Sequence, residues 1–194
     1  MNIAIYCGSN FGKNEIYRIT ALKMVDYLAK ENCSIVYGGS ESGLMGVISN
    51  YALKKSIPVY GVITHDLAKK ELENEKLSNI FKVNSMRERK IKMEELADAF
   101  IAYPGGFGTL EEISEILTSI QVGYSTKPCA FFNVNGYYDN LLAFLQNAVN
   151  EGFMLKEHLD SIIVSDDIQE IYKGFINYEA PKSKWEILKA LTNH

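Results

Sequence analysis

The sequence is poor in cysteine and contains no long apolar run, and both shortages exclude classes of protein. The three cysteines, Cys7, Cys33 and Cys129, are widely spaced, so neither a disulfide framework nor a zinc site is predicted. No stretch approaches the roughly 18 consecutive apolar residues of a membrane span. The first residues, MNIAIYCGSN, lack the basic start and the cleavage site of a secretory signal. We therefore expect a cytoplasmic protein without a membrane partner.

Positive charge and histidine are also scarce. The formal net charge of −4 argues against nucleic acid as a partner. His65, His158 and His194 show neither a His-x-x-His nor a Glu-x-x-His spacing, so no metal site is predicted. No glycine-rich stretch fits the lysine-containing phosphate loop or the dinucleotide fingerprint, and no Gly-x-Ser-x-Gly elbow occurs. The sequence therefore indicates neither a metal nor a bound cofactor.

Short apolar runs alternate with amphipathic segments along the chain. The runs at 2–8, 33–39, 57–63, 98–106 and 127–134 predict buried strands, with 80–85 and 161–165 as further candidates. Helices are predicted at roughly 14–31, 43–55, 86–97, 109–122 and 138–151, and the charged segment 64–79 as a surface loop or short helix. This alternation predicts an α/β fold: a three-layer, Rossmann-like, doubly wound parallel sheet with helices on both faces.

Three of the predicted strands end in glycine-rich loops, at 7–10, 38–46 and 104–109. In an open doubly wound sheet, ligands bind at the carboxyl ends of the strands, and glycine lets a ligand approach the backbone closely. Three such loops at one sheet edge describe a crevice of nucleotide size. Because 194 residues suit one compact domain, we expect a single nucleotide-binding α/β domain at 1–180. The tail at 181–194 is expected to be a short helix or frayed.

Two of the three arginines lie in the stretch SMRERK, residues 85–90, at the start of a predicted helix. Arginine binds carboxylate or phosphate in a bidentate way that lysine cannot reproduce. Cations at a helix N-terminus oppose the helix dipole, so local stability does not explain Arg89 and Lys90. We interpret these two as functional and Arg87 as a solvated residue of the helix start.

The stretch YPGGFGTLEE, residues 103–112, combines an anion-binding type of loop with two acidic residues. One interpretation is structural, because Thr109 and Glu112 have the spacing of a capping box at a helix start. The other is functional: a carboxylate lies beside a bound anion, with Arg89 and Lys90 supplying compensating charge. Spacing alone leaves both interpretations open.

These residues carry a resemblance to a known family. SMRERK (85–90) followed by PGGFGTLEE (104–112) resembles the paired signature of the LOG ("Lonely Guy") family of cytokinin riboside 5′-monophosphate phosphoribohydrolases. The similarity extends to YCGS (6–9), VYGGSESGLMG (36–46), ELADAFIAYPGGFGTLEE (95–112), KPCAFFNVNGYYDNLLAFL (127–145) and EGF (151–153). Family members have often carried the label lysine decarboxylase, but no pyridoxal-phosphate site is discernible in this sequence.

The resemblance implies hydrolysis of the N-glycosidic bond of a nucleoside 5′-monophosphate, either a cytokinin nucleotide or AMP, to free base and ribose 5-phosphate. It implies Arg89 and Glu112 as the catalytic pair. The positions similar to nucleotide-contacting residues of the family are Glu71, Lys90, Gly106, Phe107, Gly108, Thr109, Leu110, Glu111 and Thr118. It also implies a homodimer or larger homo-oligomer with the site near the subunit interface.

The sequence departs from the family pattern at two positions. Ser40 stands where a third glycine is usual, and Arg87 where histidine is common. Two other functions stay open. One is a nucleotide carrier or sensor without turnover, because fold alone does not determine function. The other is a nucleosidase for another purine or pyrimidine nucleotide, because base choice depends on the shape of the pocket.

Overall fold

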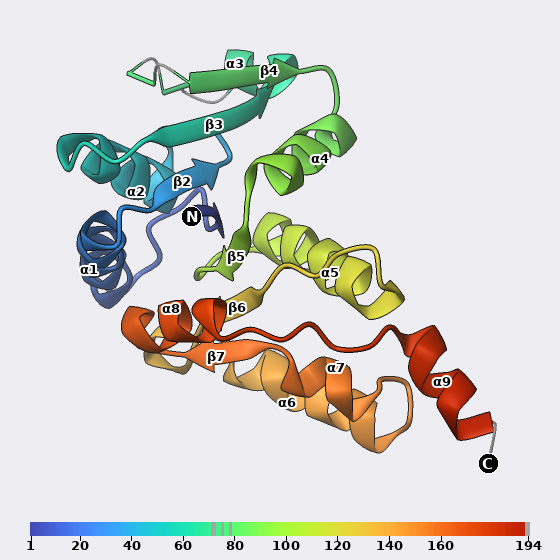
Figure 1. Cartoon of the computed structure of the whole chain (residues 1–194). Coiled ribbons are helices and arrows are strands. Elements are labelled where there is room, and N and C mark those ends of the chain that lie inside the picture. Colours follow the sequence, from blue (N-terminus) through green and yellow to red (C-terminus); the bar gives the residue numbers. More distant parts are fainter. Residues whose placement is uncertain (71–72, 75, 78, 193–194) are drawn as a thin grey trace.

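The computed structural model describes residues 1–70, 73–74, 76–77 and 79–192. Within them, seven parallel strands form one sheet in the order β4-β3-β2-β1-β5-β6-β7 (Figure 1). The strands are β1 (Asn2–Tyr6), β2 (Ser34–Tyr37), β3 (Val59–Thr64), β4 (Asn79–Val83), β5 (Ala99–Ala102), β6 (Cys129–Phe132) and β7 (Ile163–Ser165). The predicted doubly wound α/β fold is confirmed.

Helices cover both faces of the sheet. One face carries α1 (Ile16–Lys30), α2 (Gly43–Lys54) and α8 (Ile168–Ile176), and the other carries α4 (Met86–Leu96), α5 (Phe107–Val122) and α6 (Asp139–Asn150). The central strands β1, β5 and β6 are almost entirely apolar because both of their faces are buried, whereas the edge strands β4 and β7 are only partly buried. In β1, for example, Ile3 and Ile5 pack against the first group of helices, whereas Ala4 and Tyr6 pack against the second.

The remaining elements lie at the ends of the sheet and in its connections. They are the short helices α3 (His65–Lys70) and α7 (Lys156–Asp160), a single 3-10 turn η1 (Val134–Gly136), and α9 (Lys184–Thr192) near the C-terminus. The segment expected to be a loop or short helix thus contains α3 and is followed by β4. The helices α7 and α8 were not predicted, although Ile168, Ile171 and Phe175 of α8 form a buried apolar stripe.

The chain reverses its direction of strand addition between β1 and β5. Strands β2, β3 and β4 are added on one side of β1, and β5, β6 and β7 on the other. Tyr6, the last residue of β1, pairs with Ala102, the last residue of β5. Both strands therefore end at the same level, and the loops after them emerge at the switch point where doubly wound sheets bind ligands.

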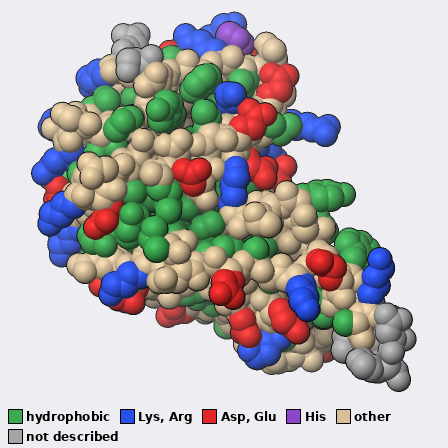
Figure 2. All heavy atoms as spheres, in the orientation of Figure 1, with side chains coloured by type: hydrophobic (Ala, Val, Ile, Leu, Met, Phe, Trp, Pro, Cys, Tyr) green, Lys and Arg blue, Asp and Glu red, His purple; other side chains and the backbone are tan. Residues whose placement is uncertain are grey.

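The molecular surface mixes charge and hydrophobic area. In the orientation of Figure 2, hydrophobic side chains reach the surface over much of the visible face, and side chains of both charge signs lie around them. No helix in the described ranges has the length and apolar character needed to cross a bilayer.

Candidate active site

A cavity of about 480 Å³ lies at the switch point, beyond the carboxyl ends of β1 and β5. Residues from all three glycine-rich loops line it, among them Gly8, Gly38 and Gly106. The amide of Gly8 donates to the Pro104 carbonyl at 3.1 Å, and the carbonyl of Gly8 accepts from the Leu44 amide at 3.1 Å. The first loop thus links the other two, and the expectation that the three loops meet at one sheet edge is confirmed.

Helix α4 is capped by neutral and acidic groups and does not depend on its basic residues. The Ser85 hydroxyl accepts from the Glu88 amide at 3.1 Å, and the Glu88 carboxylate accepts from the Asn84 amide at 2.9 Å. These bonds satisfy the donors at the helix start. Arg87 is exposed, in agreement with its interpretation as a solvated residue, whereas Arg89 is only 7% exposed.

The guanidinium of Arg89 is held by two backbone carbonyls. Its Nε donates to the Val62 carbonyl of β3 at 2.9 Å, and its Nη2 donates to the Gly38 carbonyl after β2 at 3.1 Å. Gly38 makes this approach possible, since a Cβ there would lie 2.1 Å from Arg89 Nη2. The end of the β2–β3 half of the sheet therefore fixes the guanidinium in one orientation.

The third partner of Arg89 is Glu112 of α5, on the other side of the switch point. Arg89 Nη1 lies 3.2 Å from Glu112 Oε1, and Glu112 is 9% exposed. Burial raises the pKa of the Glu112 carboxyl to about 7, and the neighbouring guanidinium of Arg89 opposes this rise without cancelling it. A carboxyl that titrates near neutral pH inside a cavity has the properties of a general base.

The capping-box interpretation of Thr109 and Glu112 is wrong. Helix α5 begins at Phe107, with Gly106 as its N-cap and no side-chain capping bond. Phe107 and Gly108 adopt helical conformation, which places Thr109 and Glu112 inside the helix. The Glu112 carboxylate therefore points to Arg89 instead of turning back to the helix start.

The other acidic residue of the motif, Glu111, makes a separate ion pair. The ammonium of Lys90 contacts the Glu111 carboxylate and lies 2.7 Å from Glu115. Hydrogen bonds to Glu111 and then to Glu115 raise the pKa of Lys90. Neither Lys90 nor Glu111 is among the residues that line the cavity. The two basic residues thus pair with different acids: Arg89 with Glu112, which lines the cavity, and Lys90 with Glu111 and Glu115, which do not.

The start of α5 opens into the cavity. Gly106, Phe107, Gly108 and Thr109 all line it. A Cβ at Gly106 or Gly108 would meet no atom within 4 Å, so an incoming group can approach the backbone there. The first amides of a helix lack intrahelical acceptors and sit at the positive end of its dipole. This arrangement is suited to an anion such as phosphate.

Three further predicted binding residues lie outside the cavity lining, and one cannot be placed. Leu110 and Thr118 are exposed on α5, and the Thr118 hydroxyl donates to the Ser114 carbonyl at 2.8 Å within the same helix. Like Glu111, they are not among the residues that line the cavity. Glu71 lies outside the residues that the structure describes.

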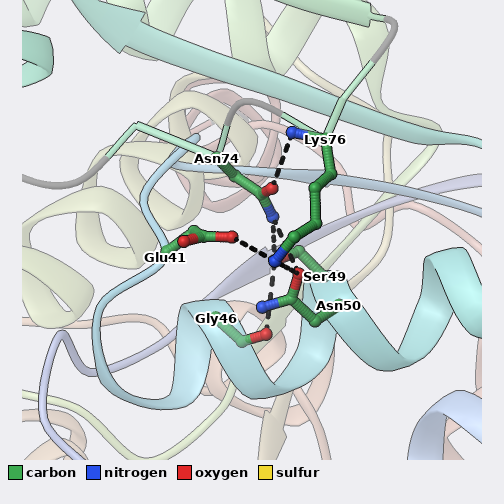
Figure 3. Close-up of polar contacts among 6 residues, drawn as sticks. All are labelled: Glu41, Gly46, Ser49, Asn50, Asn74 and Lys76. Carbon is green, nitrogen blue, oxygen red and sulfur yellow. Dashed lines mark hydrogen bonds and ion pairs between the residues drawn. The ribbon is translucent and has the colours of Figure 1, made fainter.

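Asn74 connects the second glycine-rich loop to α2, and Figure 3 shows the contacts of its side chain. The Asn74 amide donates to the Gly39 carbonyl at 3.1 Å, and its side-chain nitrogen donates to the Ser49 hydroxyl of α2 at 3.0 Å. Ser40, which departs from the family pattern, is buried, and its hydroxyl accepts from the Ser42 amide at 3.0 Å just before α2. Serine is thus accommodated in this loop with its hydroxyl bonded.

Sequence reasoning missed the aromatic wall of the cavity. Phe11, Tyr17 and Tyr137 line it, with the rings of Tyr17 and Tyr137 in an edge-on contact at 5.8 Å between centroids. The signal available was the position of Tyr137 in the connection after β6, directly behind η1. Cys7 also lines the cavity, and burial raises the pKa of its thiol far above the usual range, which agrees with a structural role.

Among the described side chains, no group of three or more histidine, cysteine, aspartate or glutamate residues is arranged to hold a metal ion.

Comparison with solved structures shows which known proteins share the fold. A molybdenum cofactor binding protein from Rippkaea orientalis superposes with a TM-score of 0.65 at 18% identity, covering 89% of this chain and 93% of that one. A Moco carrier protein from Chlamydomonas reinhardtii gives a TM-score of 0.65 at 14% identity with the same coverages. At such identities the likeness concerns the fold alone.

Comparison of sequences identifies the family. A family model described as "Possible lysine decarboxylase" matches residues 45–175. The chain is 43% identical over 152 residues to cytokinin riboside 5′-monophosphate phosphoribohydrolase LOG2 of Arabidopsis thaliana, covering 78% of this chain and 71% of that protein. It is 39% identical over 191 residues to LOG4 of the same plant, with coverages of 95% and 89%. These matches confirm the resemblance found in the motifs, and the chain belongs to the LOG family.

Proposed function

We propose that the protein hydrolyses the N-glycosidic bond of a nucleoside 5′-monophosphate, releasing free base and ribose 5-phosphate. The observation that carries this proposal is the buried Arg89–Glu112 pair, which faces the same cavity as the open start of α5. The start of α5 is suited to the phosphate, and the Arg89–Glu112 pair is suited to the sugar. The names of the relatives support the same reaction, because they are phosphoribohydrolases of cytokinin riboside 5′-monophosphates.

The phosphate would bind at the start of α5, against the backbone amides of Gly106, Gly108 and Thr109. This group is remote from the bond that breaks, and its binding energy would hold the ribose in position for the reaction. Nucleosides that lack the phosphate should therefore be poor substrates. Arg89 would compensate the charge of two nearby anions, the phosphate and the Glu112 carboxylate.

Cleavage of the glycosidic bond develops positive charge on the ribose in an oxocarbenium-like transition state. The Glu112 carboxylate would stabilise this charge and accept a proton from the attacking water. The water oxygen bonds to C1′ as the C1′–N bond breaks, the electron pair of that bond leaves with the base, and the base takes up a proton from solvent. Arg89 would keep the carboxylate oriented toward the sugar.

The test is a chromatographic assay of base release from AMP, GMP, CMP, UMP and isopentenyladenosine monophosphate. We expect adenine or isopentenyladenine to be released, and a Glu112→Gln protein to lose at least 100-fold in kcat, since a positioned general base contributes a factor of roughly 100 to 10,000. Release of only another base would identify a different nucleosidase. Binding of AMP with no base released from any of the five would identify a carrier or sensor instead.

We also propose that the protein forms a homodimer or a larger homo-oligomer. Ile91 of α4 and Phe107 and Leu110 of α5 are exposed apolar side chains, and Phe107, which lines the cavity, is 92% exposed. Burial of such side chains against a second copy would remove apolar surface from water. Light scattering coupled to size-exclusion chromatography gives the mass in solution, and a monomeric mass at micromolar concentration would contradict the proposal.

A further inference from the structure

The segment that leads into α5 has each of its three consecutive carbonyls bonded to a donor from elsewhere in the chain. The Tyr103 carbonyl accepts from the Tyr138 hydroxyl at 2.9 Å. The Pro104 carbonyl accepts from the Gly8 amide at 3.1 Å. The Gly105 carbonyl accepts from the Tyr137 hydroxyl at 2.5 Å. The path of the backbone before the helix is therefore determined by outside contacts and not by the helix itself.

The last of these bonds sets the direction of an amide group in the cavity. No peptide bond in the described ranges is cis, so the Gly105 carbonyl and the Gly106 N–H of one peptide unit point in opposite directions. Holding the carbonyl toward Tyr137 thus turns the Gly106 N–H to the other side. Gly106 lines the cavity, and the space above its Cα is open.

Tyr137 is itself held in place on several sides. Its ring lies edge-on to Tyr17 at 5.8 Å and to Tyr138 at 5.0 Å between centroids. The turn that carries it is fixed by Asn133, whose side chain accepts from the Tyr138 amide at 2.7 Å and donates to Asp139 at 2.7 Å. Tyr137 is 44% exposed and lines the cavity. Because of the ring contacts and the fixed turn, its phenol is a rigid group at the cavity wall.

We propose that Tyr137 is a positioning residue for phosphate recognition: its hydroxyl fixes the Gly105–Gly106 peptide so that the Gly106 N–H faces the 5′-phosphate of the substrate. This inference rests on the proposed function and adds to it a residue outside the signature motif. Because the bond acts on the phosphate end, its loss weakens binding of the phosphate and lowers kcat/KM for a monophosphate.

The test compares Tyr137→Phe with Tyr138→Phe, which removes a similar hydroxyl from the neighbouring ring. Tyr138 fixes the peptide unit before Pro104, which has no N–H, so its loss changes no amide donor. Binding of ribose 5-phosphate and of ribose is measured by titration calorimetry. We expect Tyr137→Phe to weaken ribose 5-phosphate binding roughly 5- to 10-fold, the usual effect of one hydrogen bond, with ribose binding unchanged. We expect Tyr138→Phe to keep the wild-type preference for ribose 5-phosphate over ribose.

Equal ribose 5-phosphate affinity in wild type and Tyr137→Phe would overturn the inference, as would an equal loss in both variants. A wild-type protein that does not bind ribose 5-phosphate would overturn it as well. Because the readout is binding and not turnover, the proposed reaction is judged separately. A wild type that binds ribose 5-phosphate, shows the Tyr137 effect and releases no base contradicts only the hydrolysis.

Discussion

The guanidinium of Arg89 lies 3.2 Å from the carboxylate of Glu112, and both side chains are almost completely removed from solvent. Burial and ion pairing have opposite effects on the carboxyl group, and burial is the larger one. The pair therefore combines a cation fixed by backbone carbonyls with an acid that changes its charge near neutral pH.

The first prediction is a pH dependence of activity. Glu112 must be ionised to act as a base, and burial raises its pKa to about 7. We expect kcat/KM for AMP to rise with pH and to level off above about pH 7. Glu95→Gln, which changes an exposed carboxylate paired with Lys92, serves as the control and should keep the profile. A rate already constant from pH 5 upward would contradict this role of Glu112.

The second prediction is a pH dependence of stability. The folded protein binds the Glu112 proton more tightly than the unfolded chain, so this proton stabilises the fold below about pH 4.5. The contribution is lost as pH rises through about 7. Relative to Glu112→Gln, the free energy of unfolding of the wild type should fall by up to about 3 kcal/mol over this interval. Urea titrations at pH 4.5 and 8 measure it, and parallel curves for the two proteins would refute it.

The third prediction concerns the geometry of the cation. Arg89→Lys keeps the charge but cannot donate to Val62, Gly38 and Glu112 together, so buried carbonyls lose their donor. We expect a loss of about 1–3 kcal/mol in the free energy of unfolding and at least a 10-fold lower kcat. Arg18→Lys, at an exposed pair with Glu15, should change stability by less than about 0.5 kcal/mol. Wild-type kinetics for Arg89→Lys would show that charge alone suffices.

The fourth prediction concerns the support of the second glycine-rich loop. Asn74 is fully buried, and its side chain bonds Ser49 and the Lys76 amide (Figure 3). Asn74→Ala leaves these partners unsatisfied and should lower the free energy of unfolding by about 1–3 kcal/mol. Lys76→Ala removes a solvent-accessible ion pair with Glu41 and a 3.5 Å contact with the Asn50 side chain, and should change the free energy of unfolding by less than about 1 kcal/mol. Chemical denaturation of both variants measures these changes. Equal losses of unfolding free energy in the two variants would mean that Asn74 does not anchor the loop.

Much of the fold was predictable, because buried strands and amphipathic helices leave periodic patterns. The apolar stripe of Ile113, Ile116 and Ile120 located α5 correctly. Its first residue was misplaced, because Phe107 and Gly108 are weak helix formers in a glycine-rich context. Helix α8 was not predicted, although Ile168, Ile171 and Phe175 have the spacing of an apolar helix face.

The site was predictable in its residue types but not in its contacts. Arg89 and Glu112 were selected from their motifs, yet only the packing of α4 and α5 on one face of the sheet brings them together. The raised pKa of Glu112 depends on burial, which residue spacing does not report. The sequence suggests only packing for Tyr137, because the role proposed for it depends on the direction of one peptide unit, which residue spacing does not report.

The three bonds of the Arg89 guanidinium have a consequence for the way the protein folds. Strands β1 to β4 and α4 all precede Glu112 in the chain. Until α5 is present, packing Arg89 against Gly38 and Val62 would bury a cation without its counter-charge, which is strongly unfavourable. We therefore expect the elements before α5 to stay loosely packed around this arginine until α5 joins them, so that the acid proposed as the catalytic base also completes the folding of the sheet.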